Sequence, residues 1–324
     1  MTSSDTSFDL VRRRLWAALR DTGPVIASRP LEIQPRGMLD APSIRAADVI
    51  EDTQMRAHAV SGPLEPRFDA FLDGSQLTLV ARWQGVIPIV FGTVSAAIRQ
   101  RRERRLSTWG APLVRRALYA PMSQLDRDVA RVLNEMGVAV VDTLERREPD
   151  SGHPFALQEL AYQAVLADRE RVETELAVRW CERERGVLYL DGGISGSATV
   201  ARAANVVGVI KSHQTLYAEG DALAVVSALT TGQRSSVVRI ESSRRTSVAS
   251  WYLRVADAAG RDPFWGLVRV EVALDDDRSA LGRRADDVSR WILAERLPLA
   301  LPDPRWDKMA YGIRDAEEYL RAVQ

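Results

Sequence analysis

Hydrophobic and polar positions follow two periods along this chain, one typical of helices and one typical of strands. Apolar residues recur every three or four positions over residues 5–20, which predicts an amphipathic helix. Residues 21–65 are rich in proline, glycine and polar residues, and they predict a connecting segment with one short helix near residues 43–52. From Arg67 to Ile98, short β-rich apolar runs separated by Asp-Gly, Gln-Gly and Gly-Thr pairs predict three strands joined by turns.

Longer helical patterns fill the middle of the chain, and strands return toward its end. Two of these patterns cover about residues 124–147 and 155–185. Later strands are expected at 187–191, 205–211, 235–241, 248–256 and 265–274, and later helices at about 276–295 and 306–322. This order predicts an α/β fold, a mixed sheet flanked by helices, with a helical insertion or covering layer at about 124–185. We expect an N-terminal helix and connecting segment over 1–64, followed by one larger domain over 65–324.

Composition describes an ordinary globular chain with no bias toward one kind of partner. The 324 residues are 46% hydrophobic and 27% charged, which is enough to build a core. Lys+Arg and Asp+Glu both number 44, so no net charge draws the protein toward nucleic acid or membrane. Any polyanion site must therefore be a local patch. Lys211 and Lys308 are the only lysines, and all other cationic side chains are arginine.

Few residues of this chain could bind a soft metal. A single cysteine, Cys181, excludes an internal disulfide and argues against a cysteine-type zinc site, which is compatible with a cytoplasmic protein. Three histidines, His58, His153 and His213, argue against a multi-histidine site. A metal would therefore be bound by carboxylates. The N-terminal segment predicts no secretory signal, and no apolar stretch approaches the roughly 18 residues of a membrane span.

Two aspartates occupy matching places at the ends of apolar runs. Asp73 ends FDAFLD and precedes Gly74, and Asp191 ends VLYLD and precedes Gly192. One such Asp-Gly pair is most often a turn, but two of them at the ends of apolar runs are more suggestive of a functional site. If the two strands are neighbours, both carboxylates emerge at one sheet edge, where a divalent cation would relieve their repulsion. Oxygen ligands without histidine or cysteine favour Mg²⁺ or Mn²⁺.

Further carboxylates could complete such a site. The second long helix carries Glu170, Glu173 and Glu175 shortly before the Asp191 strand. These glutamates form either ion pairs with nearby arginines on a solvated face or, for one of them, a third ligand projecting over the sheet edge. Asp303, in a proline-framed turn, either caps the last helix or lies near the other acids.

Candidate cationic residues lie in two places. Lys211 ends the run NVVGVIK, as a surface charge or as a phosphate contact and charge stabiliser. The run RQRRERR contains Arg99, Arg101, Arg102, Arg104 and Arg105. Such runs are usually solvated surface, but a loop after three strands would suit contacts with a nucleic-acid backbone. The sequence contains neither a GxxxxGK[ST] phosphate loop nor a GxSxG elbow.

The order of these motifs resembles the NurA family of nucleases over about residues 67–323. The most specific pieces are FLDGSQ, LYLDGGISG and VVGVIKSH. The resemblance implies an RNase H-like fold, Mn²⁺-dependent cleavage of DNA, and a homodimer that docks on the hexameric HerA ATPase. It also implies that Asp73 and Asp191 are metal ligands. Glu175 or Glu173 would match the helix-borne acid, and Lys211 the strand-end lysine.

Two positions depart from the family pattern. The turn PLALPD is similar to the family's Pro-Leu turn, but Asp303 stands where that turn commonly ends in histidine. Gly193 stands where the family has serine. The leading hypothesis is a metal-dependent DNA nuclease acting in end processing, repair or defence with a HerA-like translocase. The alternative is a catalytically inactive subunit that keeps the fold and the partner interface. An Argonaute-like relative is disfavoured, because the chain is short for guide-binding domains.

Overall fold

A large mixed β-sheet forms the centre of the protein in a computed structural model, which describes residues 8–19, 31–32, 42–103, 105–145, 152–243, 245–296 and 308–323. In spatial order its strands are β3 (Asp48–Val49), β14 (Val238–Ser242), β15 (Arg245–Arg254), β16 (Leu267–Ala273), β11 (Val206–Ile210), β10 (Leu188–Asp191), β5 (Ala70–Gln84), β6 (Ile87–Arg102), β8 (Leu113–Ala120) and β9 (Ala139–Asp142). The sheet is extended by β1 (Leu31–Glu32), β4 (Ala57–Ala59), β7 (Arg105–Thr108) and β13 (Gln233–Ser235). A separate pair joins β2 (Ser43–Ile44) and β12 (Thr215–Leu216).

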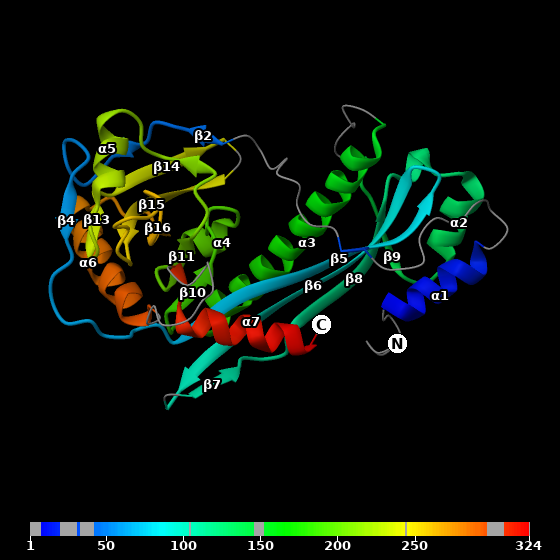
Figure 1. Cartoon of the computed structure of the whole chain (residues 1–324). Helices are drawn as coiled ribbons and strands as arrows, with labels where there is room; N and C mark the ends of the chain where they lie inside the picture. Colours follow the sequence, from blue (N-terminus) through cyan, green and yellow to red (C-terminus); the bar gives the residue numbers. More distant parts are fainter. Residues whose placement is uncertain are drawn as a thin grey trace.

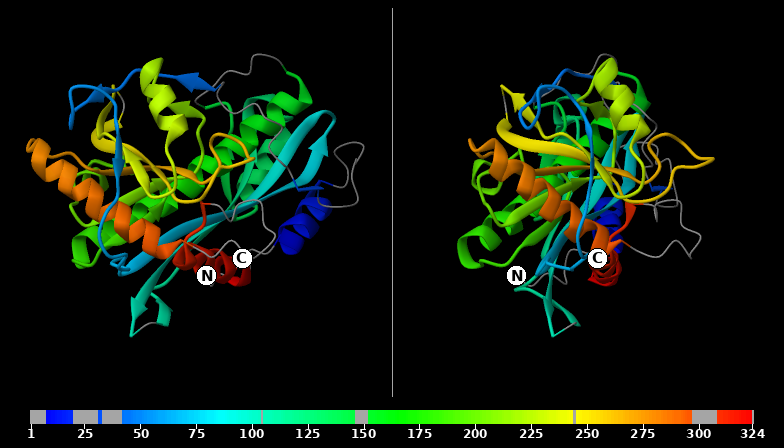
Figure 2. Two further views of the ribbon diagram at one scale, coloured as in Figure 1. Left: turned by 60° about the vertical axis from the view of Figure 1, so that its left-hand side comes forward. Right: turned by 90° about the vertical axis from the view of Figure 1, so that its left-hand side faces the viewer.

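Helices cover both faces of this sheet (Figures 1 and 2). They are α1 (Phe8–Ala18), α2 (Arg127–Glu135), α3 (Pro154–Arg183), α4 (Ala198–Ala201), α5 (Asp221–Ala228), α6 (Arg278–Glu295) and α7 (Tyr311–Val323), with a 3₁₀ turn at Met122–Gln124. The long helix α3 lies along β5, β6 and β8 on one face, and α6 and α7 lie on the other. This arrangement confirms the predicted α/β class, a mixed sheet flanked by helices. None of the described helices is long and apolar enough to cross a membrane.

Alternation along β5 and β10 divides their side chains between two cores. Leu72 and Leu190 pack in the core beside α3, whereas Phe71 and Tyr189 pack in the core beside α6 and α7. Successive side chains of a strand point to opposite faces. The aspartate that follows in each strand therefore points to the side of α7. Helix α7 lies close to the sheet because Gly312 has no side chain, and a Cβ there would overlap the ring of Phe71.

The prediction of three strands between Arg67 and Ile98 is wrong. Two long antiparallel strands, β5 and β6, occupy this segment, and they are joined by a tight turn in which Gly85 has φ +57°. The Asp73-Gly74 pair lies inside β5, opposite residues of β6, and does not form a turn. Gly92 also lies inside β6 and not in a turn. Glycine is needed there because the ring of Tyr119 on the next strand occupies the space of a side chain.

Two of the predicted helices also differ from the structure. The helix expected over 124–147 ends at Glu135, since Gly137 adopts φ +69° and residues 139–142 form β9, which pairs in parallel with β8. The short helix expected near 43–52 is replaced by β2 and β3, whose backbone pairs with β12 and β14. Strands from the predicted connecting segment therefore join the main sheet.

Candidate functional site

The two predicted aspartates lie side by side on neighbouring parallel strands. Leu190 of β10 lies opposite Leu72 of β5, so Asp191 and Asp73 follow in adjacent positions. Strand β10 ends there, whereas β5 continues to Gln84, and the edge of β5 beyond the aspartates is no longer covered by β10. Both aspartates line one pocket of about 500 Å³. The structure thus brings together two acids that are far apart in the sequence.

Asp73 is the most buried acid of this pocket. Its side chain is 6% exposed, and its Oδ1 accepts a hydrogen bond from the backbone N–H of Gly74 at 2.8 Å. Burial raises the pKa of Asp73 well above its ordinary range. The charge of Asp191 raises this pKa further, and that of Lys211 lowers it. A divalent cation would reverse this unfavourable electrostatic environment.

Lys211 is the cationic partner of Asp191. It directly follows β11, and its Nζ donates a hydrogen bond to Asp191 Oδ2 at 2.8 Å. The same Nζ lies 3.9 Å from Met309 Sδ, at the approach to α7. Lys211 therefore lies within the pocket, which makes it more than a surface charge at a strand end.

The structure distinguishes the two candidate glutamates of α3. Glu173 is buried, and its carboxylate fills the space beside Gly74, where a Cβ atom would overlap Glu173 Oε1. Arg169 Nε lies 3.4 Å from the same oxygen. Glu175, in contrast, is one-third exposed and forms ion pairs with Arg115 and Arg179. Glu173 is therefore the glutamate that lies beside Gly74 and Asp73, and both glutamates keep an ion pair with a nearby arginine.

We predict that Glu173 makes the metal-free protein less stable as the pH rises. Burial raises the pKa of Glu173 from the ordinary value of 4.5 to about 7, Arg169 opposes this shift, and Asp191 adds to it. Because the folded state holds this proton between these two values, stability falls as the pH rises through about 7. The effect is about 3 kcal/mol at most, since one pKa unit corresponds to about 1.4 kcal/mol.

Urea unfolding at pH 5 and pH 8 with a chelator measures this effect. Glu173→Gln should reduce the pH dependence, and Asp73, whose pKa is shifted in the same direction, should account for part of what remains. Glu175→Gln, two residues along the same helix, should leave the dependence unchanged. An identical pH dependence in the wild type and in Glu173→Gln would show that Glu173 is not responsible.

The arginine run lies at the end of β6 and the start of β7, which pair as a hairpin, and the predicted loop is wrong (Figure 1). Arg99 forms an ion pair with Asp315 of α7 and donates to Thr108. Arg101 donates to both oxygens of Glu295 at 2.7 Å. These two guanidinium groups therefore attach the hairpin to the helices, and their partners are carboxylates of this chain.

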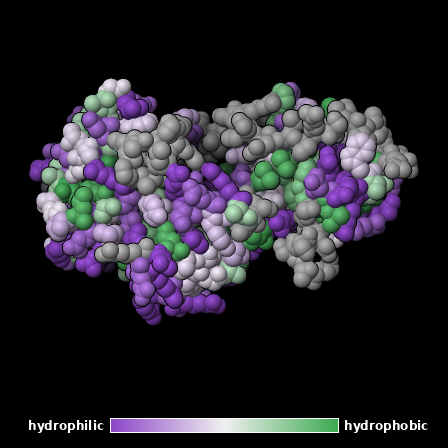
Figure 3. All heavy atoms as spheres, turned by 60° about the horizontal axis from the view of Figure 1, so that its bottom comes forward, coloured by the Kyte–Doolittle hydropathy of each residue, from purple (hydrophilic) through white to green (hydrophobic). Residues whose placement is uncertain are grey.

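Only part of the arginine run remains as a candidate nucleic-acid contact. Arg102 and Arg105 are exposed on the projecting hairpin, where Figure 3 shows mainly hydrophilic side chains. Arg104 lies outside the described residues, as does Asp303, the predicted replacement for the family histidine. Their predicted roles are not addressed by the structure.

The pocket also contains residues that the sequence did not indicate. They are Gln76, Arg169, Lys308, Met309, Glu317 and Arg321. Gln76 Oε1 is buried and, within the part of the chain that the structure describes, has no hydrogen-bond partner. Only Lys308 had a recognisable signal, as one of the two lysines. The others come from three elements whose packing no local pattern specifies.

Glu271 of β16 fixes the loop that follows Asp191. It is almost fully buried, accepts a hydrogen bond from the backbone N–H of Ile194 at 2.9 Å, and pairs with Arg269. A Cβ atom at Gly193 would lie 3.0 Å from Glu271 Oε2. This crowding gives a physical reason for glycine where the resemblance leads one to expect serine.

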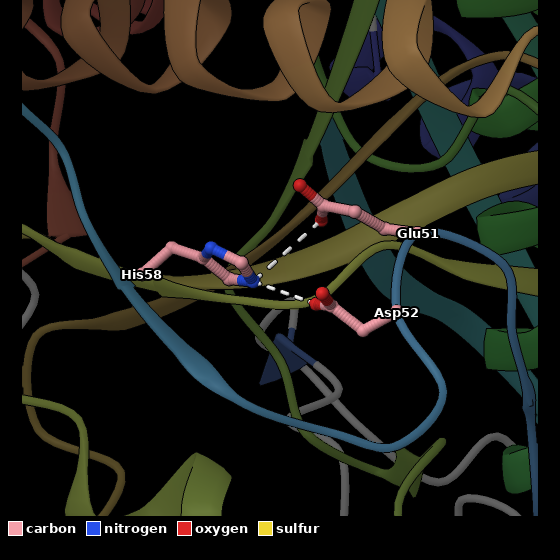
Figure 4. A group of neighbouring side chains, drawn as sticks. All are labelled: Glu51, Asp52 and His58. Carbon is pink, nitrogen blue, oxygen red and sulfur yellow. Dashed lines mark hydrogen bonds and ion pairs between the residues drawn. The ribbon is translucent and has the colours of Figure 1, made fainter.

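A second acidic group, shown in Figure 4, lies near β13 and is not part of the lining of the aspartate pocket. Potential ligand atoms of Glu51, Asp52 and His58 lie within 4.8 Å of one another, and among the described residues no other three acids, histidines or cysteines are grouped so closely. The pocket acids are thus more loosely grouped. However, Arg234 donates to both oxygens of Glu51 at 2.7 and 2.8 Å, and Asp52 Oδ2 accepts from Ser236 Oγ at 2.6 Å. This group is already satisfied as an ion-pair network.

Comparisons with solved structures find a likeness in fold at low sequence identity. No protein-family model and no curated protein matches this sequence. The crystal structure of the NurA nuclease from Sulfolobus solfataricus matches over 96% of this chain and 86% of that chain, with 10% sequence identity and a TM-score of 0.45. A likeness of this size does not establish a shared activity, so the function must be inferred from the side chains of the pocket.

Proposed function

We propose that this protein is a divalent-metal-dependent nuclease of NurA type that hydrolyses phosphodiester bonds in DNA. The observation that supports this most directly is the pairing of two kinds of charge in one pocket. Asp73 and Asp191 lie on one wall, and Lys211, Lys308 and Arg321 also line it. Metal-assisted phosphodiester hydrolysis needs acidic groups that bind the metal and basic groups that bind the phosphate.

The donor atoms of the pocket fit a hard divalent cation. Asp73, Asp191 and the nearby Glu173 supply carboxylate oxygens, and Gln76 adds a buried carbonyl oxygen that has no partner among the described residues. Among the described residues, the pocket lining includes neither histidine nor cysteine. Such an all-oxygen set suits Mg²⁺ or Mn²⁺ better than zinc or copper.

Each side chain then has a defined task in cleavage. Bound metal would supply an activated water and charge stabilisation for the leaving oxygen. Asp73 and Asp191 would hold the metal from adjacent rigid strands, which fixes their separation. In the metal-free protein Lys211 orients the Asp191 carboxylate through its 2.8 Å hydrogen bond, and with metal bound its positive charge would be available to the phosphate. Glu173, with a pKa raised to about 7 by burial, can hold or release a proton near neutral pH.

The biological setting that we propose follows the motif resemblance. It comprises a homodimer in the cytoplasm that works with a HerA-like hexameric ATPase on DNA in end processing, repair or defence. What supports it is the order of FLDGSQ, LYLDGGISG and VVGVIKSH along the chain.

A non-catalytic subunit is the second candidate function. It is favoured by the loose grouping of the pocket acids, which contrasts with the close group at Glu51. In such a subunit Lys211 would remain the permanent partner of Asp191.

Digestion of linear DNA tests the proposal. We expect the purified protein to degrade end-labelled DNA with Mn²⁺ and to stop when a chelator is added. Asp191→Asn, which removes a ligand charge, should lose this activity while keeping a cooperative thermal transition. Equal digestion by both proteins would remove the assignment. A folded wild type that neither digests DNA nor binds Mn²⁺ by calorimetry would support the non-catalytic subunit.

A further inference from the structure

Both lysines of this chain lie in the same pocket. Lysine and arginine together number 44, and only Lys211 and Lys308 are lysine. Four basic residues line the pocket, and both lysines are among them, with Arg169 and Arg321. The two lysines come from separate elements, nearly one hundred positions apart, so their meeting is a product of the fold. Their common location indicates that this pocket requires ammonium groups.

The two ammonium groups are held differently. Lys211 Nζ binds the Asp191 carboxylate, which neutralises its charge in the metal-free state. Lys308 Nζ donates to the backbone carbonyl oxygen of Lys211 at 3.3 Å. This contact places Lys308 in the aspartate pocket, next to the backbone of Lys211. Arg321 lies on the same wall, where it pairs with Glu317 at 3.6 Å.

Lysine and arginine bind phosphate in different ways. An ammonium is a compact point charge with three donors, whereas guanidinium is a wide planar fork. A compact charge suits a position close to carboxylates and to the oxygens of neighbouring phosphates. A chain that uses arginine nearly everywhere else, yet has lysine at both positions beside the aspartates, fits this requirement.

We propose that Lys308 binds a second phosphate of the substrate strand, next to the phosphate held by Lys211 and the acids. This inference rests on the proposed nuclease function and assigns a substrate-positioning residue to it. Lys308 thereby sets the register of the strand relative to Asp73 and Asp191. Because the contact is to a phosphate, it is independent of base sequence.

Oligonucleotide binding without cleavage tests this role. In an Asp73→Asn background, we expect Lys308→Ala to weaken the binding of a labelled single strand about 10-fold at low salt, measured by fluorescence anisotropy. The slope of log affinity against log salt should fall by about 0.7, the value for one phosphate contact on a single strand. Lys308→Arg should retain the slope, because it keeps the charge. Arg131→Ala, on the exposed surface of α2, should change neither quantity.

The outcomes separate this inference from the proposed function. An unchanged salt slope in Lys308→Ala, with Mn²⁺-dependent digestion by the wild type, would overturn the Lys308 role alone. Absence of digestion and of Mn²⁺ binding in the wild type would overturn the nuclease proposal, whatever the slope shows. A thermal melt of each variant confirms that the fold is retained.

Discussion

Asp73→Asn is expected to abolish metal-dependent DNA cleavage and, at the same time, to stabilise the metal-free protein at neutral pH. The carboxylate is buried, and burial together with the charge of Asp191 raises its pKa well above the ordinary range. When folding raises the pKa of a carboxyl group, the protein becomes less stable as the pH rises through the pKa of the folded state. Asparagine keeps the shape and can still accept the Gly74 hydrogen bond, but carries no charge. Loss of the ligand charge should lower the cleavage rate about 10²–10³-fold or more.

Asp52→Asn is the matched control for this prediction. Asp52 belongs to the ion-pair network near β13, where Ser236 and His58 donate to it. Its substitution should lower the melting temperature and leave cleavage unchanged, which is the opposite pattern. Differential scanning calorimetry with a chelator and initial cleavage rates with Mn²⁺ measure both effects. If Asp73→Asn were active, or clearly less stable than the wild type, Asp73 would have a structural role instead of a ligand role.

The second large effect is a difference between two glutamates that lie two residues apart on α3. Glu173→Gln should lower cleavage about 10²-fold or more, because the buried carboxylate beside Gly74, next to Asp73, loses its charge. Glu175→Gln should retain nearly full activity. That carboxylate is paired with Arg115 and Arg179 on the outer side of the helix, and such partly exposed pairs contribute about 1 kcal/mol or less to stability.

Cleavage rates over a range of Mn²⁺ concentrations distinguish a lost ligand from a lost proton carrier. A lost ligand raises the Mn²⁺ concentration needed for half-maximal rate, whereas a lost proton carrier lowers the maximal rate and changes its pH profile. Equal loss of activity in both variants would indicate that α3 as a whole is disturbed. Activity in Glu173→Gln combined with loss in Glu175→Gln would reverse the assignment.

The sequence predicted the two aspartates at one sheet edge on the condition that their strands are neighbours, and it did not indicate the groups around them. Each aspartate ends an apolar run that must be buried, so parallel pairing of the two strands brings both to one edge. The choice between Glu173 and Glu175 depends on the rotation of α3 over the sheet, which is set by packing. Val172 and Leu176 are buried under the helix, and Gly74 opens the space that Glu173 fills.

Local propensity failed where long-range pairing dominates. Asp-Gly favours a turn, but Asp73 and Gly74 pair with residues of β6, and the long β5–β6 hairpin overrides the local preference. The sequence indicated a solvated or phosphate-binding run that includes Arg99 and Arg101. It could not reveal their carboxylate partners, because these lie on α6 and α7, roughly two hundred residues away. Lys308 likewise reaches the pocket only because α7 packs against β5.

Crystals soaked in Mn²⁺ and measured at the manganese absorption edge test the central claim most directly. The account predicts an anomalous peak between the carboxylates of Asp73 and Asp191, with Lys211 moved away from Asp191. A peak at Glu51, Asp52 and His58 instead, or an empty pocket at saturating Mn²⁺, would contradict it.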